Sequence, residues 1–77
     1  MSVKVLFFAS LRERLGKSHV LLDVAESLSV RDVWLRSSGE SALPENVLAA
    51  INHEYAEAES LVQSGDEVAF FPPVTGG

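Results

Sequence analysis

One strong helical pattern, in a chain that otherwise consists of short apolar runs, constrains the fold more than any other feature. Ser29 is a typical N-cap residue, and Asp32 follows three positions later, as in a weak capping box. Val30, Val33 and Trp34 stand at helical spacing, so this helix has one apolar face to bury. Because no second long helix is available to cover that face, strands must do so. The sequence therefore predicts a two-layer α+β domain with Trp34 in its core.

The remaining apolar runs are typical of strands. They span residues 3–9, 18–24, 47–52, 55–56 and 67–71. The second is predicted to lie antiparallel to the first, within a mixed sheet of four to five strands. A short helical turn is predicted after the first strand, because Ser10 and Glu13 match a capping box and Gly16 is a typical stop. Residues 37–46 are predicted to be a loop and carry no motif.

Composition limits the class of protein. With 77 residues and no cysteine, the chain is predicted to be a single domain without disulfides, thiolate metal ligands or a cysteine nucleophile. Its net charge of -5 disfavours a nucleic-acid partner and favours a basic protein surface as partner. No apolar stretch approaches the roughly 20 residues that span a bilayer, and the N-terminus lacks a signal-sequence pattern. We expect a cytoplasmic protein with no membrane partner.

The folded body shows no catalytic or metal-binding motif. His19 and His53 are the only histidines, and a strand and a helix separate them in the sequence. Neither a Gly-x-Gly-x-x-Gly motif nor a phosphate-binding loop is present. We interpret both histidines as surface residues and expect no metal and no nucleotide pocket in this chain.

The C-terminus does offer chemistry. Gly76 and Gly77 lack a Cβ, so they can enter a channel too narrow for other residues. The carboxylate of Gly77 can be activated as an acyl-adenylate, and a nucleophile can then leave sulfur, or a partner amine, on the terminus. The sequence therefore predicts a domain over residues 1–73 and a flexible tail over 74–77 that a partner enzyme processes.

Two aromatic residues mark a surface at the root of this tail. In the first strand Lys4 should face water, and strand alternation then places Phe8 on the same face. In the last strand Glu67 and Phe71 share a face by the same argument. If the terminal strands pair, Phe8 and Phe71 form an exposed patch for a partner. The alternative is that a loop of this chain covers them. The predicted partner surface comprises Phe8, Arg12, Tyr55, Phe71, Pro72 and Pro73.

Residues 3–13 and 65–77 resemble the small subunit of molybdopterin synthase, a ubiquitin-like sulfur carrier of the β-grasp fold. Residues 50–52 and Tyr55 match the hairpin of that family. A terminal double glycine alone is shared with ubiquitin and with the sulfur carrier of the thiazole pathway. The Phe-Phe-Pro-Pro stretch at residues 70–73 favours the molybdopterin family.

The resemblance implies a role for each part of the chain. An adenylating enzyme of the ubiquitin-activating type would use ATP to activate Gly77, which then becomes a thiocarboxylate. Val74, Thr75 and Gly76 would thread into the large synthase subunit, where the sulfur passes to cyclic pyranopterin monophosphate. The chain would thus be the sulfur-donating subunit of a sulfurtransferase, in a heterotetramer of two small and two large subunits, with no cofactor of its own. Three alternatives remain open: a sulfur carrier of another pathway, of the thiazole type, a protein modifier joined to lysine, and a plain interaction module.

Overall fold

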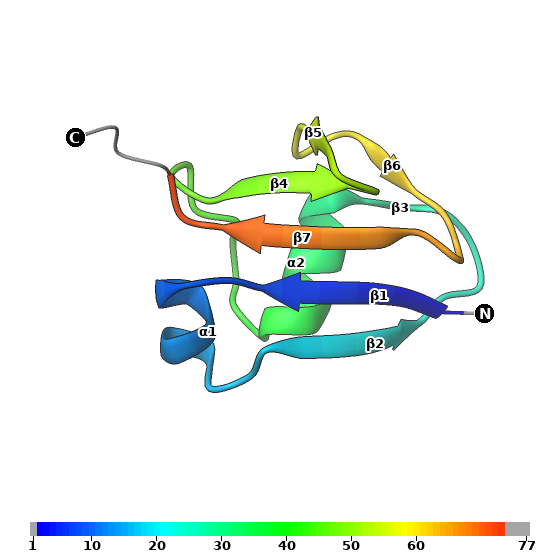
Figure 1. The fold of residues 1–77 in the computed structure, drawn as a ribbon. Helices are drawn as coiled ribbons and strands as arrows, with labels where there is room; N and C mark the ends of the chain where they lie inside the picture. Colours follow the sequence, from blue (N-terminus) through cyan, green and yellow to red (C-terminus); the bar gives the residue numbers. More distant parts are fainter. Residues whose placement is uncertain (1, 74–77) are drawn as a thin grey trace.

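The computed structural model describes residues 2–73. In chain order the elements are β1 (Ser2–Phe7), α1 (Ser10–Leu15), β2 (His19–Asp23), β3 (Leu28–Ser29), α2 (Val30–Ser38), β4 (Leu48–Ile51), β5 (Glu54–Ala56), β6 (Leu61–Val62) and β7 (Glu67–Phe71). Five strands form one sheet in the order β2-β1-β7-β4-β5, and β3 pairs with β6 in a separate two-stranded sheet. Figure 1 shows α2 behind the larger sheet, so the predicted two-layer α+β architecture is confirmed.

The two terminal strands lie side by side in the middle of the sheet. β1 runs antiparallel to β2, as predicted, and parallel to β7, which in turn runs antiparallel to β4. The sheet is therefore mixed. Because β1 and β7 are parallel, their carboxyl ends lie at the same end of the sheet (Figure 1).

The core is a cluster of three aromatic rings between the sheet and α2. Trp34 is fully buried, with its ring centroid 5.0 Å from Phe70 and 6.0 Å from Phe7 in edge-on geometry. Its indole Nε1–H donates to the carbonyl oxygen of Ala42 at 3.0 Å, so the buried polar atom is satisfied. The prediction that Trp34 is a core residue is confirmed.

Helix α2 begins as the sequence predicted and ends slightly later. The Ser29 hydroxyl accepts a hydrogen bond from the amide of Asp32 at 3.1 Å, which is the predicted N-cap. The loop predicted from residue 37 is wrong for its first two residues, because the helix continues to Ser38. The Ser37 hydroxyl donates to the carbonyl of Val33 at 2.7 Å, and this bond allows a polar residue to be buried within the helix.

The capping box predicted at Ser10 is wrong, although the helical turn itself exists. Ala9 is the N-cap of α1, and no side chain caps the helix. Ala9 adopts φ 53° and ψ -130°, while the amide of Leu11 donates to the carbonyl of Phe8 at 3.1 Å. A tight turn therefore joins β1 directly to α1 and places Ser10 inside the helix. Gly16 ends α1 at φ 72°, as predicted.

The sequence did not predict the small second sheet. β3 and β6 pair antiparallel through Leu28 and Val62, which are both buried, and each strand has only two residues. This pairing joins the start of α2 to the segment that leads into β7. Leu28 and Val62 both belong to the hydrophobic core.

Candidate functional site

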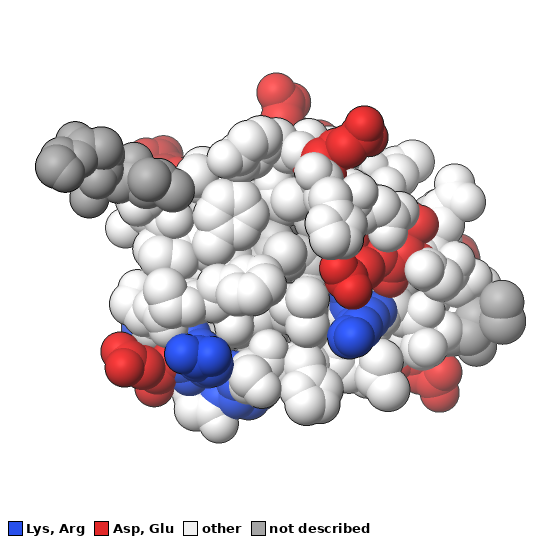
Figure 2. Space-filling model, in the orientation of Figure 1, with Lys and Arg blue, Asp and Glu red and all other residues white. Residues whose placement is uncertain are grey.

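The sheet face opposite α2 is open. Figure 2 views this face and shows a broad area without charged side chains over the middle of the sheet. Phe8 is 46% exposed and Tyr55 is 78% exposed, whereas Phe71 is half-buried. These side chains are therefore not covered by a loop of the described chain, and the prediction of an exposed aromatic patch is confirmed.

Strand pairing brings the predicted patch residues together. Phe7 lies opposite Phe70 in the parallel β1–β7 pair, and the amide of Phe8 donates to the carbonyl of Phe70 at 3.1 Å. The rings of Tyr55 and Phe71 are in contact, with centroids 5.8 Å apart. Phe8, which follows β1, thus lies with Tyr55 of β5 and Phe71 of β7 near the end of β7.

A shallow hollow of about 290 Å³ lies within this patch. Its lining residues are Phe8, Ala50, His53, Tyr55, Ala69 and Phe71. Ala50 and Ala69 are direct cross-strand partners in the β4–β7 pair. Because their side chains are small, they leave the centre of the patch lower than the aromatic rings around it. Ala50, Ala69 and His53 were not among the predicted residues of this site, although strand alternation places Ala69 on the same face as Phe71.

The β4–β5 turn positions Tyr55 and His53. Asn52 and His53 have positive φ values of 50° and 74°, which produce a tight turn between β4 (Leu48–Ile51) and β5 (Glu54–Ala56). The Asn52 side chain donates to Asp66 Oδ1 at 3.0 Å and accepts from the amide of Glu67 at 2.9 Å. These two bonds tie the hairpin to the start of β7 and fix one wall of the hollow.

Three other predicted surface residues lie around the patch. Arg12 is exposed on α1 but does not line the hollow. It forms no ion pair with any residue between 2 and 73, whereas its neighbour Arg14 pairs with Glu40 at 2.8 Å. Pro72 is half-buried and Pro73 is exposed, directly after β7. The predicted tail residues Val74, Thr75, Gly76 and Gly77 lie outside the described residues.

The two histidines lie at opposite edges of the sheet. His19 is on β2, and His53 follows β4, so they cannot share a ligand. Both are exposed, as predicted. In the described part of the chain, no three histidine, aspartate or glutamate side chains gather where they could hold a metal ion. No helix between residues 2 and 73 has the length and apolarity needed to cross a bilayer.

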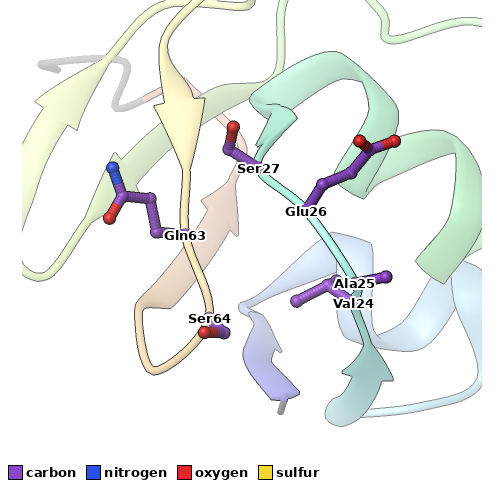
Figure 3. Close-up of a pocket in the computed structure, with 6 residues that line it drawn as sticks. All are labelled: Val24, Ala25, Glu26, Ser27, Gln63 and Ser64. Atoms are coloured by element: carbon purple, nitrogen blue, oxygen red, sulfur yellow. The ribbon is translucent and has the colours of Figure 1, made fainter.

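A second hollow lies at the other end of the sheet, between the segment after β2 and the segment after β6. Its lining residues are Val24, Ala25, Glu26, Ser27, Gln63 and Ser64. Figure 3 shows the side chains of Glu26 and Gln63 pointing to opposite sides of this space. They do not converge on a common point, so they do not form a catalytic arrangement. The aromatic patch is the candidate functional site.

Known proteins share both the sequence and the fold. The model of the ThiS family matches residues 5–77. Molybdopterin synthase sulfur carrier subunits from Haemophilus influenzae and Escherichia coli are 42% and 40% identical, covering 97% of this chain and 99% of each relative. The crystal structure of SAMP1 from Haloferax volcanii superposes with a TM-score of 0.80 at 30% identity, covering 100% of both chains. The fold is the ubiquitin-like β-grasp that the sequence predicted. These comparisons confirm the resemblance drawn from the sequence, and the chain belongs to the ThiS family.

Proposed function

We propose that the chain is a sulfur carrier in molybdenum cofactor biosynthesis, acting as the small subunit of molybdopterin synthase. The observation that carries this proposal is the position of β7. This strand lies between β1 and β4, and its last residue, Phe71, belongs to the exposed aromatic patch. A partner seated on the patch therefore lies beside the end of β7, the last strand before Gly77 in the sequence. The full-length similarity to two sulfur carrier subunits supports the same function.

The reacting group in this proposal is the carboxylate of Gly77. An adenylating partner joins it to the α-phosphate of ATP and releases pyrophosphate, which converts a poor electrophile into an acyl-adenylate. A sulfur nucleophile then displaces AMP, and the terminus becomes a thiocarboxylate. Val74, Thr75 and Gly76 carry this group into the large subunit, which supplies the active site for sulfur transfer to cyclic pyranopterin monophosphate.

The aromatic patch is the docking surface for both partners in this proposal. Phe8, Tyr55 and Phe71 offer exposed aromatic area, and such residues commonly dominate binding energy at interfaces. Pro72 and Pro73 have no backbone N–H, so they cannot donate to a neighbouring strand after β7. Arg12 contributes at the edge of the surface. The net charge of -5 suits partners with basic surfaces. The complete synthase contains two small and two large subunits.

Intact-mass spectrometry tests the proposal. The chain is incubated with ATP, a cognate adenylating enzyme and a sulfur donor. The expected product has one oxygen replaced by one sulfur, and a variant without Gly77 remains unchanged under the same conditions. A wild-type mass that stays constant, with an enzyme shown to be active on its own carrier, would remove the proposed function.

The second candidate function is protein modification. It is favoured by the structural match to SAMP1, a small archaeal modifier protein of Haloferax volcanii. A modifier also uses an adenylated glycine carboxylate, but it ends as an amide on a lysine of another protein. Denaturing electrophoresis of cells that express a tagged chain separates the two functions. A ladder of conjugates that disappears when Gly77 is deleted would support modification, and its absence together with a thiocarboxylate would support sulfur transfer.

A further inference from the structure

We propose that the hollow in the aromatic patch is a socket for a single apolar side chain of the large synthase subunit, and that Ala50 and Ala69 determine the size of that side chain. This inference rests on the proposed function and specifies its docking surface. It assigns a role to two residues that carry no reactive group.

The shape of the hollow follows from strand register. Ala69 pairs with Leu6 on β1 and with Ala50 on β4, so it lies at the centre of the open face. Phe8, Phe71 and Tyr55 line the hollow around the two alanines. A floor of methyl groups with aromatic walls can accept a leucine, methionine or phenylalanine side chain but offers no partner to a buried polar group.

The charges around the hollow favour a partner that inserts an apolar side chain and carries a lysine or arginine next to it. None of the lining residues is acidic, and His53 is the only titratable side chain of the lining besides the Tyr55 hydroxyl. Glu67 lies at the rim, with its carboxylate 3.4 Å from His53 Nε2 and its side chain 32% exposed. A lysine or arginine beside the inserted side chain could pair with Glu67 without entering the hollow.

The tail identifies the occupant as the large subunit. Phe71 is both a wall of the hollow and the last residue of β7. Whatever fills the hollow therefore contacts the residue that directly precedes the C-terminal segment with Gly77. A second copy of this chain seated there would cover Phe71, but it has no active site that could use the Gly77 carboxylate. The large subunit needs the tail in its active site, so the same contact that binds it also directs the terminus.

The absence of cysteine from the chain makes occupancy directly measurable. The variant Ala69→Cys places a unique thiol on the floor of the hollow. The control Ala25→Cys places one on an exposed residue in the other hollow, at the far end of the sheet. Alkylation by iodoacetamide is followed by mass with and without the large subunit of Haemophilus influenzae, whose small subunit is 42% identical. We expect saturating large subunit to slow alkylation of Ala69→Cys at least about tenfold and to leave Ala25→Cys unchanged.

A filling variant gives a second readout. In Ala69→Leu the new leucine side chain fills the hollow, so the partner's side chain cannot enter it. This variant should bind the large subunit about tenfold or more weakly, while its melting temperature changes little. Ala25→Leu is the matched control and should bind as the wild type does.

The outcomes separate the socket from the function on which it rests. Equal alkylation rates for Ala69→Cys with and without a partner that binds the wild type would overturn the socket and leave sulfur transfer standing. Protection of Ala69→Cys at high concentration of the chain without any partner would also overturn it, because a second copy of the chain would then occupy the hollow. If the wild type fails to bind the large subunit at all, the proposed function and the socket fail together.

Discussion

Phe70 and Phe71 are adjacent in β7 and point to opposite faces of the sheet, so truncating them one at a time separates folding from partner binding. Phe70 is fully buried and stacks on Phe7, with ring centroids 6.0 Å apart, and its ring centroid lies 5.0 Å from that of Trp34. Phe71 is half-buried on the open face and contacts Tyr55. Phe70→Ala should therefore destabilise the fold, whereas Phe71→Ala should weaken docking.

The expected magnitudes differ in both measurements. Truncating a buried phenylalanine costs about 3–5 kcal/mol, and each kcal/mol lowers the melting temperature of a domain this small by about 4–8 °C. Phe70→Ala should thus melt at least about 12 °C lower, or fail to fold. Phe71→Ala loses partly exposed area and one ring contact, which costs about 1 kcal/mol of stability. Its affinity for the large subunit should fall by at least about 2 kcal/mol, roughly thirtyfold.

Circular dichroism melting and calorimetric titration provide the two readouts, with each titration run well below the melting temperature of the variant. The reasoning predicts that Phe71→Ala changes affinity more than stability. If Phe71→Ala melts as low as Phe70→Ala, or binds the large subunit as tightly as the wild type, the assignment of Phe71 to the docking surface is wrong.

Three further substitutions test the parts of the fold that support the site. Asn52→Ala removes the hydrogen bond to Asp66 and leaves a residue with a Cβ at positive φ, so it should lower the free energy of unfolding by about 2 kcal/mol. Asn52→Gly should recover part of this loss, because glycine adopts positive φ without strain. Equal melting temperatures for the two variants would refute the role of φ. Ala9→Gly should raise stability by roughly 1 kcal/mol, because glycine adopts that backbone conformation with little strain; a lower melting temperature would contradict the turn described between β1 and α1. Trp34→Phe leaves the carbonyl of Ala42 without its donor and should cost about 2 kcal/mol by the same melting assay, and an unchanged curve would show that this bond contributes nothing.

Strand alternation was enough to predict much of the site. Lys4 and Glu67 indicated which faces of the terminal strands meet water, and that placed Phe8 and Phe71 on the open face before any pairing was known. The match of residues 50–52 and Tyr55 to the hairpin of the family likewise indicated the hairpin that carries Tyr55. These predictions succeeded because each depends on neighbouring residues in the chain.

The features that the sequence did not predict depend on residues far apart in the chain. The β3–β6 pair has two residues in each strand, too few to show a period, and it forms only because Leu28 meets Val62. The floor of the hollow depends on the register that sets Ala50 opposite Ala69. Alanine in a strand gives no signal by itself, since its importance here is the space that it leaves.

The cap of α1 was predicted wrongly for a local reason. Ser10 and Glu13 fit the spacing of a capping box, but the turn at Ala9 is so tight that the helix begins at Ser10 itself. A spacing rule cannot detect this, because it assumes that the residue before the helix is free to adopt an extended conformation.

Single-turnover sulfur transfer measures whether the terminus of this chain donates the sulfur. The chain is prepared with a thiocarboxylate at Gly77 and mixed with the large subunit and cyclic pyranopterin monophosphate, and the mass of the small chain is followed with time. The account predicts that the mass returns to that of the carboxylate as molybdopterin forms, and that Phe71→Ala slows this return. A thiocarboxylate that persists in the assembled complex while the precursor remains unchanged would contradict it.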